Sequence, residues 1–221
     1  MAELTLVIGN KNYSSWSLRP WLLLKQAGIP FREVYIPTHT PQSRAAILQH
    51  SPAGRVPVLH DGNGNVTVWE SLAICEYLAE QFPDKQLWPT DRAARARARS
   101  VATEMHAGFG ALRTHMVMNC RKHLPGKGRT PEVQADIERL RALWNDCRKH
   151  YANDGNFLFG RFSIADAMYA PVATRFRTYD VELDKVSAAY RDTILALPAM
   201  HQWYADAAIE REVIEEYESG A

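Results

Sequence analysis

The sequence has little cysteine, and its few cysteines are not grouped. Cys75, Cys120 and Cys147 are widely separated, odd in number, and form no C-x-x-C pair. This pattern excludes a cysteine-ligated zinc site and fits a reducing compartment. We therefore expect a cytoplasmic protein.

Long apolar runs and an excess of charge of either sign are also missing. No stretch approaches the roughly 18 consecutive apolar residues that span a bilayer, and the opening residues have no basic segment leading an apolar one. Lys plus Arg number 26 against 25 Asp plus Glu, so the net charge is +1. We expect neither a membrane nor a nucleic-acid partner, because nothing in the charge balance attracts a polyanion. The Ala/Arg run at 91–99 is typical of an exposed helix face.

What the sequence does contain is a mixed pattern over the first ninety residues. Short β-branched runs alternate with amphipathic stretches, separated by turns rich in Gly, Asn and Pro. The pattern predicts strands at 4–8, 31–36, 56–60 and 66–69, and helices beginning near residue 15 or 17, at 41–49 and at 72–80. The resulting order, βαβαββα, is the thioredoxin-like one.

The remainder of the chain is helical in pattern. Residues 83–90 contain Pro, Asp and Lys but little periodicity, which is typical of a domain boundary. Helices are predicted at 92–122, 131–152, 164–178, 187–196 and 198–217. We therefore expect an α/β domain at 1–82, a linker at 83–90, and an all-α helical bundle domain at 91–221.

A proline at the start of a predicted strand marks the first candidate site. Proline cannot donate to a sheet ladder, so Pro57 indicates an edge, a bulge or a cis peptide bond. A cis bond would turn the backbone N–H and C=O of Val56 outward, where they could pair with an extended peptide ligand. The alternative is an ordinary loop proline.

Glu70 and Ser71 come directly before the helix predicted at 72–80. A serine at a helix start offers its hydroxyl and nearby N–H groups to an anion, and an adjacent carboxylate can take an ammonium. The pair is therefore a candidate receptor for a free α-amino-acid group. The alternative is a plain helix cap.

These two motifs together resemble one family. The segments at 51–59 and 70–78, with the strand and serine-rich loop before them, strongly resemble the glutathione transferase superfamily over the whole amino-terminal half. The resemblance implies that Val56 and Pro57 hold the cysteinyl backbone of glutathione and that Glu70 and Ser71 hold its γ-glutamyl end. It also implies a homodimer and no cofactor beyond glutathione as co-substrate.

A further match lies at 159–168 in the helical half. Ser163 and Asp166 have the S-x-x-D spacing of a capping box, in which the serine caps a helix and the acid accepts from the serine's backbone N–H. In the family this box opens a core helix, so we expect both residues to be structural.

The reacting thiol needs a hydrogen-bond donor that lowers its pKa, because the thiolate is the nucleophile. The loop after the first strand supplies Ser14, Ser15 and Tyr13. The segment resembles the zeta class, which implies Ser14 first, Ser15 second and Tyr13 third. It departs from that class at Trp16, where a cysteine is usual, so maleylacetoacetate isomerase activity is not carried over. The loop also lacks the cysteine of thiol-exchange members.

Weaker candidates complete the expected site. His39 or Gln42 could reach the glycyl carboxylate, and Arg19 or Arg55 could support the charge of the site. Helical spacing would place an electrophile pocket along Trp16, His106, Phe109, Arg113 and Met116, although such a stripe is more often core. The histidines form no metal-binding pattern, so no metal is expected.

The resulting hypothesis is a detoxifying transferase that conjugates glutathione thiolate to small hydrophobic electrophiles. Two alternatives stay open: a glutathione-dependent isomerase or dehalogenase, and a non-catalytic regulator or interaction protein of the same fold.

Overall fold

The first half of the chain folds into a four-stranded sheet flanked by three helices. The computed structural model describes residues 4–63, 65–152 and 155–219. The strands are β1 (Leu4–Ile8), β2 (Phe31–Tyr35), β3 (Val58–Asp61) and β4 (Val66–Trp69), in the order β2-β1-β3-β4. The helices are α1 (Ser15–Ala27), α2 (Ser43–Leu48) and α3 (Ser71–Gln81). β1 is parallel to β2 and antiparallel to β3, which is antiparallel to β4. The predicted thioredoxin-like order is confirmed.

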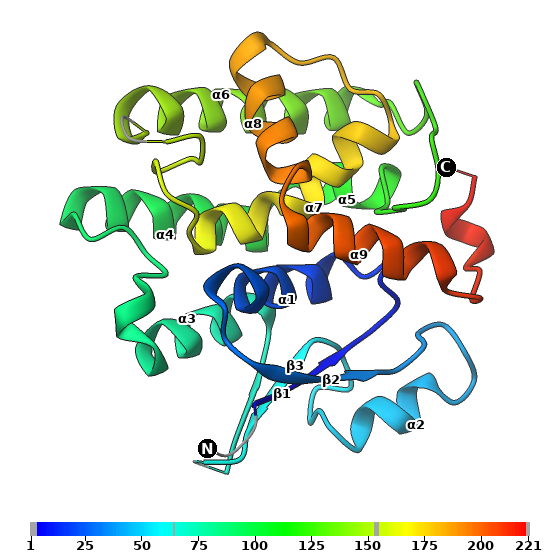
Figure 1. Cartoon of the computed structure of the whole chain (residues 1–221). Coiled ribbons are helices and arrows are strands. Elements are labelled where there is room, and N and C mark those ends of the chain that lie inside the picture. The colour runs from blue at the N-terminus through cyan, green and yellow to red at the C-terminus, as the bar shows by residue number, and fades with distance from the viewer. Residues whose placement is uncertain (1–3, 64, 153–154, 220–221) are drawn as a thin grey trace.

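The second half of the described chain is helical. Its elements are α4 (Arg92–Ala107), α5 (Gly110–His115), α6 (Pro131–Tyr151), α7 (Ile164–Thr178), α8 (Lys185–Leu195) and α9 (Pro198–Ile209). Two short 3-10 turns, η1 (Pro83–Lys85) and η2 (Glu215–Tyr217), precede and follow these helices. In Figure 1, α1 and α3 lie on the face of the sheet that looks toward the helical half, whereas α2 lies on the other side.

The centre of the helical half is α7, which packs directly on α1. The expected capping box opens it: the backbone N–H of Ser163 donates to Oδ2 of Asp166 at 2.8 Å. The other carboxylate oxygen of Asp166 accepts from the Leu158 N–H and the Tyr190 hydroxyl, each at 3.0 Å. Burial raises the pKa of Asp166 to about 6, although these hydrogen bonds oppose the shift. The box therefore fixes α7, and with it the seam between the two halves.

Two predicted helices were too long. The helix expected at 92–122 ends at Ala107, and after Gly108 and Phe109 the chain forms only the short α5 before it loses helical form. Phe109 has a φ of 58°, a left-handed conformation that no helix interior tolerates. The N–H of Leu112 is capped by Oδ2 of Asp136 at 2.9 Å. That cap comes from another helix, so local periodicity could not predict it. The last helix, expected at 198–217, ends at Ile209.

We propose that the domain boundary lies at 83–90. Among the described residues this stretch contains only η1 as regular structure, and it connects the last helix of the sheet half to the first helix of the bundle (Figure 1). Within the described ranges, no helix combines the length and the apolar character needed to cross a membrane.

Candidate functional site

Two adjoining hollows lie along the seam between the halves. The larger has a volume of about 670 Å³ and the smaller about 380 Å³. Both are lined by Trp16, Arg55 and Val56, so they form one continuous cleft. The turn 13–16 and the segment 38–40 line the larger hollow, while Pro57, Glu70, Ser71 and His106 line the smaller one.

The smaller hollow is built on unusual backbone. The Val56–Pro57 peptide bond is cis, one of the three arrangements that the sequence allowed. Val56 precedes β3 and takes part in no ladder pair, so its backbone groups are open to a ligand. Glu70 has a φ of 70°, a conformation that costs a non-glycine residue energy and is concentrated at functional sites. These observations favour a peptide-binding edge beside the start of α3.

Ser71 is the first residue of α3, and a buried cation lies behind it. Nη1 of Arg19 approaches Oγ of Ser71 at 3.4 Å, and the Arg19 side chain is completely buried. Its Nε and Nη2 have no hydrogen-bond partner within the described part of the chain. Burial, together with Arg175 and Arg113, lowers the pKa of Arg19 to about 9. The guanidinium behind Ser71 therefore has two N–H-bearing nitrogens without a partner in the described chain.

Trp16 separates the two hollows and lies against two arginines. The Arg19 guanidinium lies 4.2 Å from its ring centroid, and the Arg113 guanidinium lies 5.4 Å from it. The His106 ring meets Trp16 edge-on, at 5.3 Å between centroids. Burial and the nearby Arg19 lower the pKa of His106, while Glu70, 3.7 Å away, opposes the shift. His106 therefore belongs to the smaller hollow, beside the acid of α3.

Two serine hydroxyls open on the larger hollow at the start of α1. Oγ of Ser14 accepts the Ser17 N–H at 3.3 Å, which makes it the helix cap, and it donates to Oγ of Ser17 at 2.7 Å. Ser17 in turn accepts the Gly9 N–H at 3.1 Å, so the hydroxyl pair is tied to the end of β1. The Ser15 hydroxyl has no partner in the described part of the chain. Both serines can therefore face a bound thiol, but only Ser14 is already oriented.

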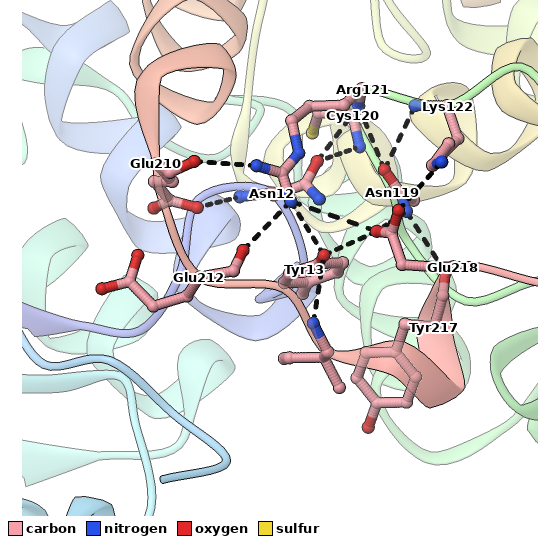
Figure 2. A network of polar contacts seen from close by, with 11 residues as sticks. Asn12, Tyr13, Asn119, Cys120, Arg121, Lys122, Glu210, Glu212, Tyr217 and Glu218 are labelled. Carbon is pink, nitrogen blue, oxygen red and sulfur yellow. Dashed lines mark hydrogen bonds and ion pairs between the residues drawn. The ribbon is translucent and has the colours of Figure 1, made fainter.

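The Tyr13 hydroxyl, the third candidate donor to the thiol, is already engaged in other hydrogen bonds. Its ring lines the larger hollow, but its hydroxyl donates to Oε1 of Glu218 at 2.6 Å. The Tyr13 hydroxyl oxygen in turn accepts from Nη2 of Arg121 at 2.8 Å and from the Ile214 N–H at 3.3 Å. Figure 2 shows this hydroxyl at the centre of a polar network. The hydrogen bonds of the Tyr13 hydroxyl therefore indicate a structural role for this residue.

The larger hollow is basic. Four arginines line it, Arg44, Arg55, Arg113 and Arg175, together with His39. No Asp or Glu lines it among the described residues. Nε of Arg175 donates to the Met116 carbonyl at 2.7 Å, and burial lowers the pKa of Arg175 to about 10. Sequence reasoning missed Arg175, because it lies in the most buried helix and no motif marks it.

Three expected site residues do not line either hollow. Phe109 and Met116 are buried in the core, since the break after α4 removes the single helix face on which they were placed. Gln42 is exposed immediately before α2. His39 does line the larger hollow, with a φ of 62°. No group of three or more His, Cys, Asp or Glu side chains in the described ranges is placed to hold a metal ion.

Comparison with known proteins identifies relatives for both halves of the chain. The family described as "Glutathione S-transferase, N-terminal domain" matches residues 13–81, and "Glutathione S-transferase, C-terminal domain" matches residues 130–206. A probable maleylacetoacetate isomerase of Caenorhabditis elegans is 29% identical over 84% of this chain and 85% of its own length. The glutathione S-transferase GstB of Escherichia coli is 23% identical over 90% and 91%.

Solved structures agree in fold. A glutathione transferase homolog from Burkholderia, crystallised with bound glutathione, superposes with a TM-score of 0.72 at 23% identity, covering 94% of this chain and all of the other. Since both domain families of one superfamily match in order, and the fold follows them, the chain belongs to the glutathione S-transferase superfamily.

Proposed function

We propose that this chain binds glutathione along the cleft and transfers its thiolate to a small hydrophobic electrophile. One observation carries the proposal: the cis Val56–Pro57 edge, the strained Glu70 with Ser71, and the serine cap of α1 all line one continuous cleft. Each element fits one part of a γ-glutamyl tripeptide. The glutathione in the Burkholderia structure supports the same choice of ligand.

The smaller hollow would take the γ-glutamyl end. Ser71 and the N–H groups at the start of α3 would bind its carboxylate, with Arg19 behind them as the buried countercharge. Glu70 would bind the ammonium. Val56 would pair through its backbone with the cysteinyl residue, and His39 and Arg55 lie in the larger hollow where the glycyl carboxylate needs a cation.

The thiol would then lie at the start of α1. Ser14 would donate its hydroxyl hydrogen to the sulfur, exchanging Ser17 for the thiolate as acceptor, and Ser15 is the second candidate. Stabilising the anion lowers the pKa of the thiol and raises the thiolate fraction at neutral pH. No other chemistry is needed for attack, because the gain comes from the thiolate and from its positioning.

A second candidate function is glutathione-dependent isomerisation of an acid. Arg113 and Arg175 line the larger hollow with no carboxylate beside them in its lining, which favours an anionic second substrate. The likeness to a probable maleylacetoacetate isomerase points the same way. Trp16 is the feature against it, because it fills the position of the cysteine that the zeta class usually carries.

The family also leads us to propose a cytoplasmic homodimer that acts in detoxification. The first test is calorimetric titration of glutathione into the wild type, Ser71→Ala and Ser14→Ala, with a conjugation assay using an aryl halide. We expect Ser71→Ala to weaken binding and Ser14→Ala mainly to slow conjugation. Absence of binding at millimolar glutathione contradicts the proposal and favours an interaction protein of this fold.

A further inference from the structure

The chain after α9 is bonded to the rest of the molecule and contributes one residue, Tyr217, to the wall of the larger hollow. We call residues 210–218 the strap. It begins beside the turn before Ser14, where the Asn12 N–H donates to Oε2 of Glu210 at 3.0 Å. It then passes the helical half, where Nη1 of Arg121 donates to the Glu210 carbonyl at 2.8 Å and Nη2 to the Glu212 carbonyl at 3.1 Å. The strap is therefore bonded to both halves of the molecule.

Glu218 fastens the far end of the strap (Figure 2). Oε1 of Glu218 accepts from the Tyr13 hydroxyl at 2.6 Å and from Nδ2 of Asn119 at 2.9 Å, and Lys122 lies 3.1 Å from Oε2. Burial raises the pKa of Glu218, but these partners outweigh burial and hold the pKa below its ordinary value. The carboxylate is thus bound in its charged form by three side chains from two segments.

Between these fastenings, Tyr217 enters the larger hollow. It is one of the residues that line this hollow, and its ring contacts two others, Tyr13 at 5.8 Å and His39 at 5.2 Å between centroids. In Figure 2 the ring points away from the polar network. The Tyr217 hydroxyl has no hydrogen-bond partner within the described part of the chain. A phenol held by its backbone, with a free hydroxyl facing a cavity, is suited to contact a second substrate.

We propose that the strap covers the larger hollow, with Glu218 as its fastening, and that Tyr217 is the residue by which it selects the second substrate. The substrate role rests on the proposed function, whereas the covering role does not. The hydroxyl can donate to an electronegative group of the electrophile, and the ring limits its size.

The covering role is tested without glutathione. Val117 lines the larger hollow and is half-buried, while Cys75, Cys120 and Cys147 are all buried, so Val117→Cys introduces one thiol into the cavity wall. Its labelling by an aromatic disulfide reports how open the hollow is. Glu218→Ala in this background should speed labelling at least about tenfold, because it removes all three contacts of the carboxylate and loss of one charge-assisted hydrogen bond alone gives about that factor in an open–closed equilibrium.

Two variants keep this test specific. Glu215→Ala removes an exposed acid from the same segment, with no side-chain partner in the described chain, and should leave the rate unchanged. Tyr13→Phe removes the Glu218 bond from its other end and should also speed labelling. Circular dichroism confirms that each variant is folded. Equal rates in all four proteins, fast or slow, contradict the covering role.

The selecting role is tested by steady-state kinetics with a small and a bulky aryl halide. Tyr217→Ala should raise the KM for the small one by roughly tenfold relative to the bulky one, and Tyr217→Phe should separate the ring from the hydroxyl. Glutathione affinity by calorimetry should stay within about twofold. An unchanged preference between the halides contradicts the selecting role. Failure of the wild type to bind glutathione contradicts the proposed function instead, and the labelling rates then still decide the covering role.

Discussion

The Tyr13 hydroxyl donates a 2.6 Å hydrogen bond to Oε1 of Glu218, a residue 205 positions further along the chain. The phenol nearest the serine cap therefore bonds outside the cleft, although its ring helps to form the wall. A hydroxyl held by a carboxylate is not free to donate to a thiolate. This contact distinguishes Tyr13 from Ser14, which immediately follows it.

Tyr13→Phe should leave the pKa of bound glutathione's thiol unchanged and lower stability. The variant keeps the ring but removes the hydroxyl that bonds Glu218, Arg121 and the Ile214 N–H, which costs about 1–3 kcal/mol. Ultraviolet titration of the thiolate and urea unfolding measure the two effects. A rise in the thiol pKa as large as that of Ser14→Ala contradicts the assignment.

Ser14→Ala should lower kcat by about 10²–10³-fold, the usual effect of removing one donor from a developing or bound anion. It should also raise the pKa of the bound thiol. The same change removes the cap of α1, which costs about 1 kcal/mol of stability. Ser14→Thr keeps a hydroxyl at the cap and should therefore restore much of the activity and of the stability.

Ser15→Ala is the matched control for that measurement, because it removes a hydroxyl one residue away that caps nothing. We expect its kcat to remain within a few-fold of the wild type. If instead Ser15→Ala raises the thiol pKa and Ser14→Ala does not, then Ser15 is the donor.

Arg113→Gln should separate the two candidate functions. If the second substrate is an acid, loss of the guanidinium should raise the KM for a carboxylate-bearing electrophile about tenfold or more, with little effect on a neutral one. Arg113→Lys keeps the charge and is the control for the lost contact with the His106 carbonyl. Equal effects on both electrophiles indicate that Arg113 supports the cleft only through packing on Trp16.

Asp166 should make stability depend on pH in an unusual direction. Burial raises the pKa of Asp166 in the folded state from an ordinary 3.8 to about 6. The contribution of the protonated carboxyl to the free energy of unfolding is therefore fully present below about pH 4 and is lost as the pH rises through about 6. Relative to Asp166→Asn, the wild type should therefore gain about 1 kcal/mol between pH 7 and pH 5. Urea unfolding of both proteins at the two pH values measures this difference, and a loss on acidification contradicts the raised pKa.

Sequence reasoning succeeded where the determinants are local. Strand periodicity and the capping box of Ser163 and Asp166 depend on residues a few positions apart, so they predicted the order of the elements and the start of α7. The unusual backbone at Pro57 and the helix start at Glu70–Ser71 were also predicted, because proline beside a strand and serine at a helix start have few structural roles.

It failed where a distant residue decides the local conformation. The carboxylate of Asp136 caps α5 from 24 positions away, so the break near Phe109 left no periodic signal. Arg175 lies in a largely buried helix and reaches the cleft because α7 packs on α1. Tyr217 was predicted to end a helix, and its place in the wall depends on bonds to residues 13 and 119.

The strap also fixes the order in which the cleft can be completed during synthesis. Every other described wall residue, from Tyr13 to Arg175, leaves the ribosome before Tyr217 does. A nascent chain released after Ile209 would hold the sheet, α9 and the serine cap, yet its cleft would lack one side. Among the described residues, Tyr217 is therefore the last part of the wall of the larger hollow to be synthesised.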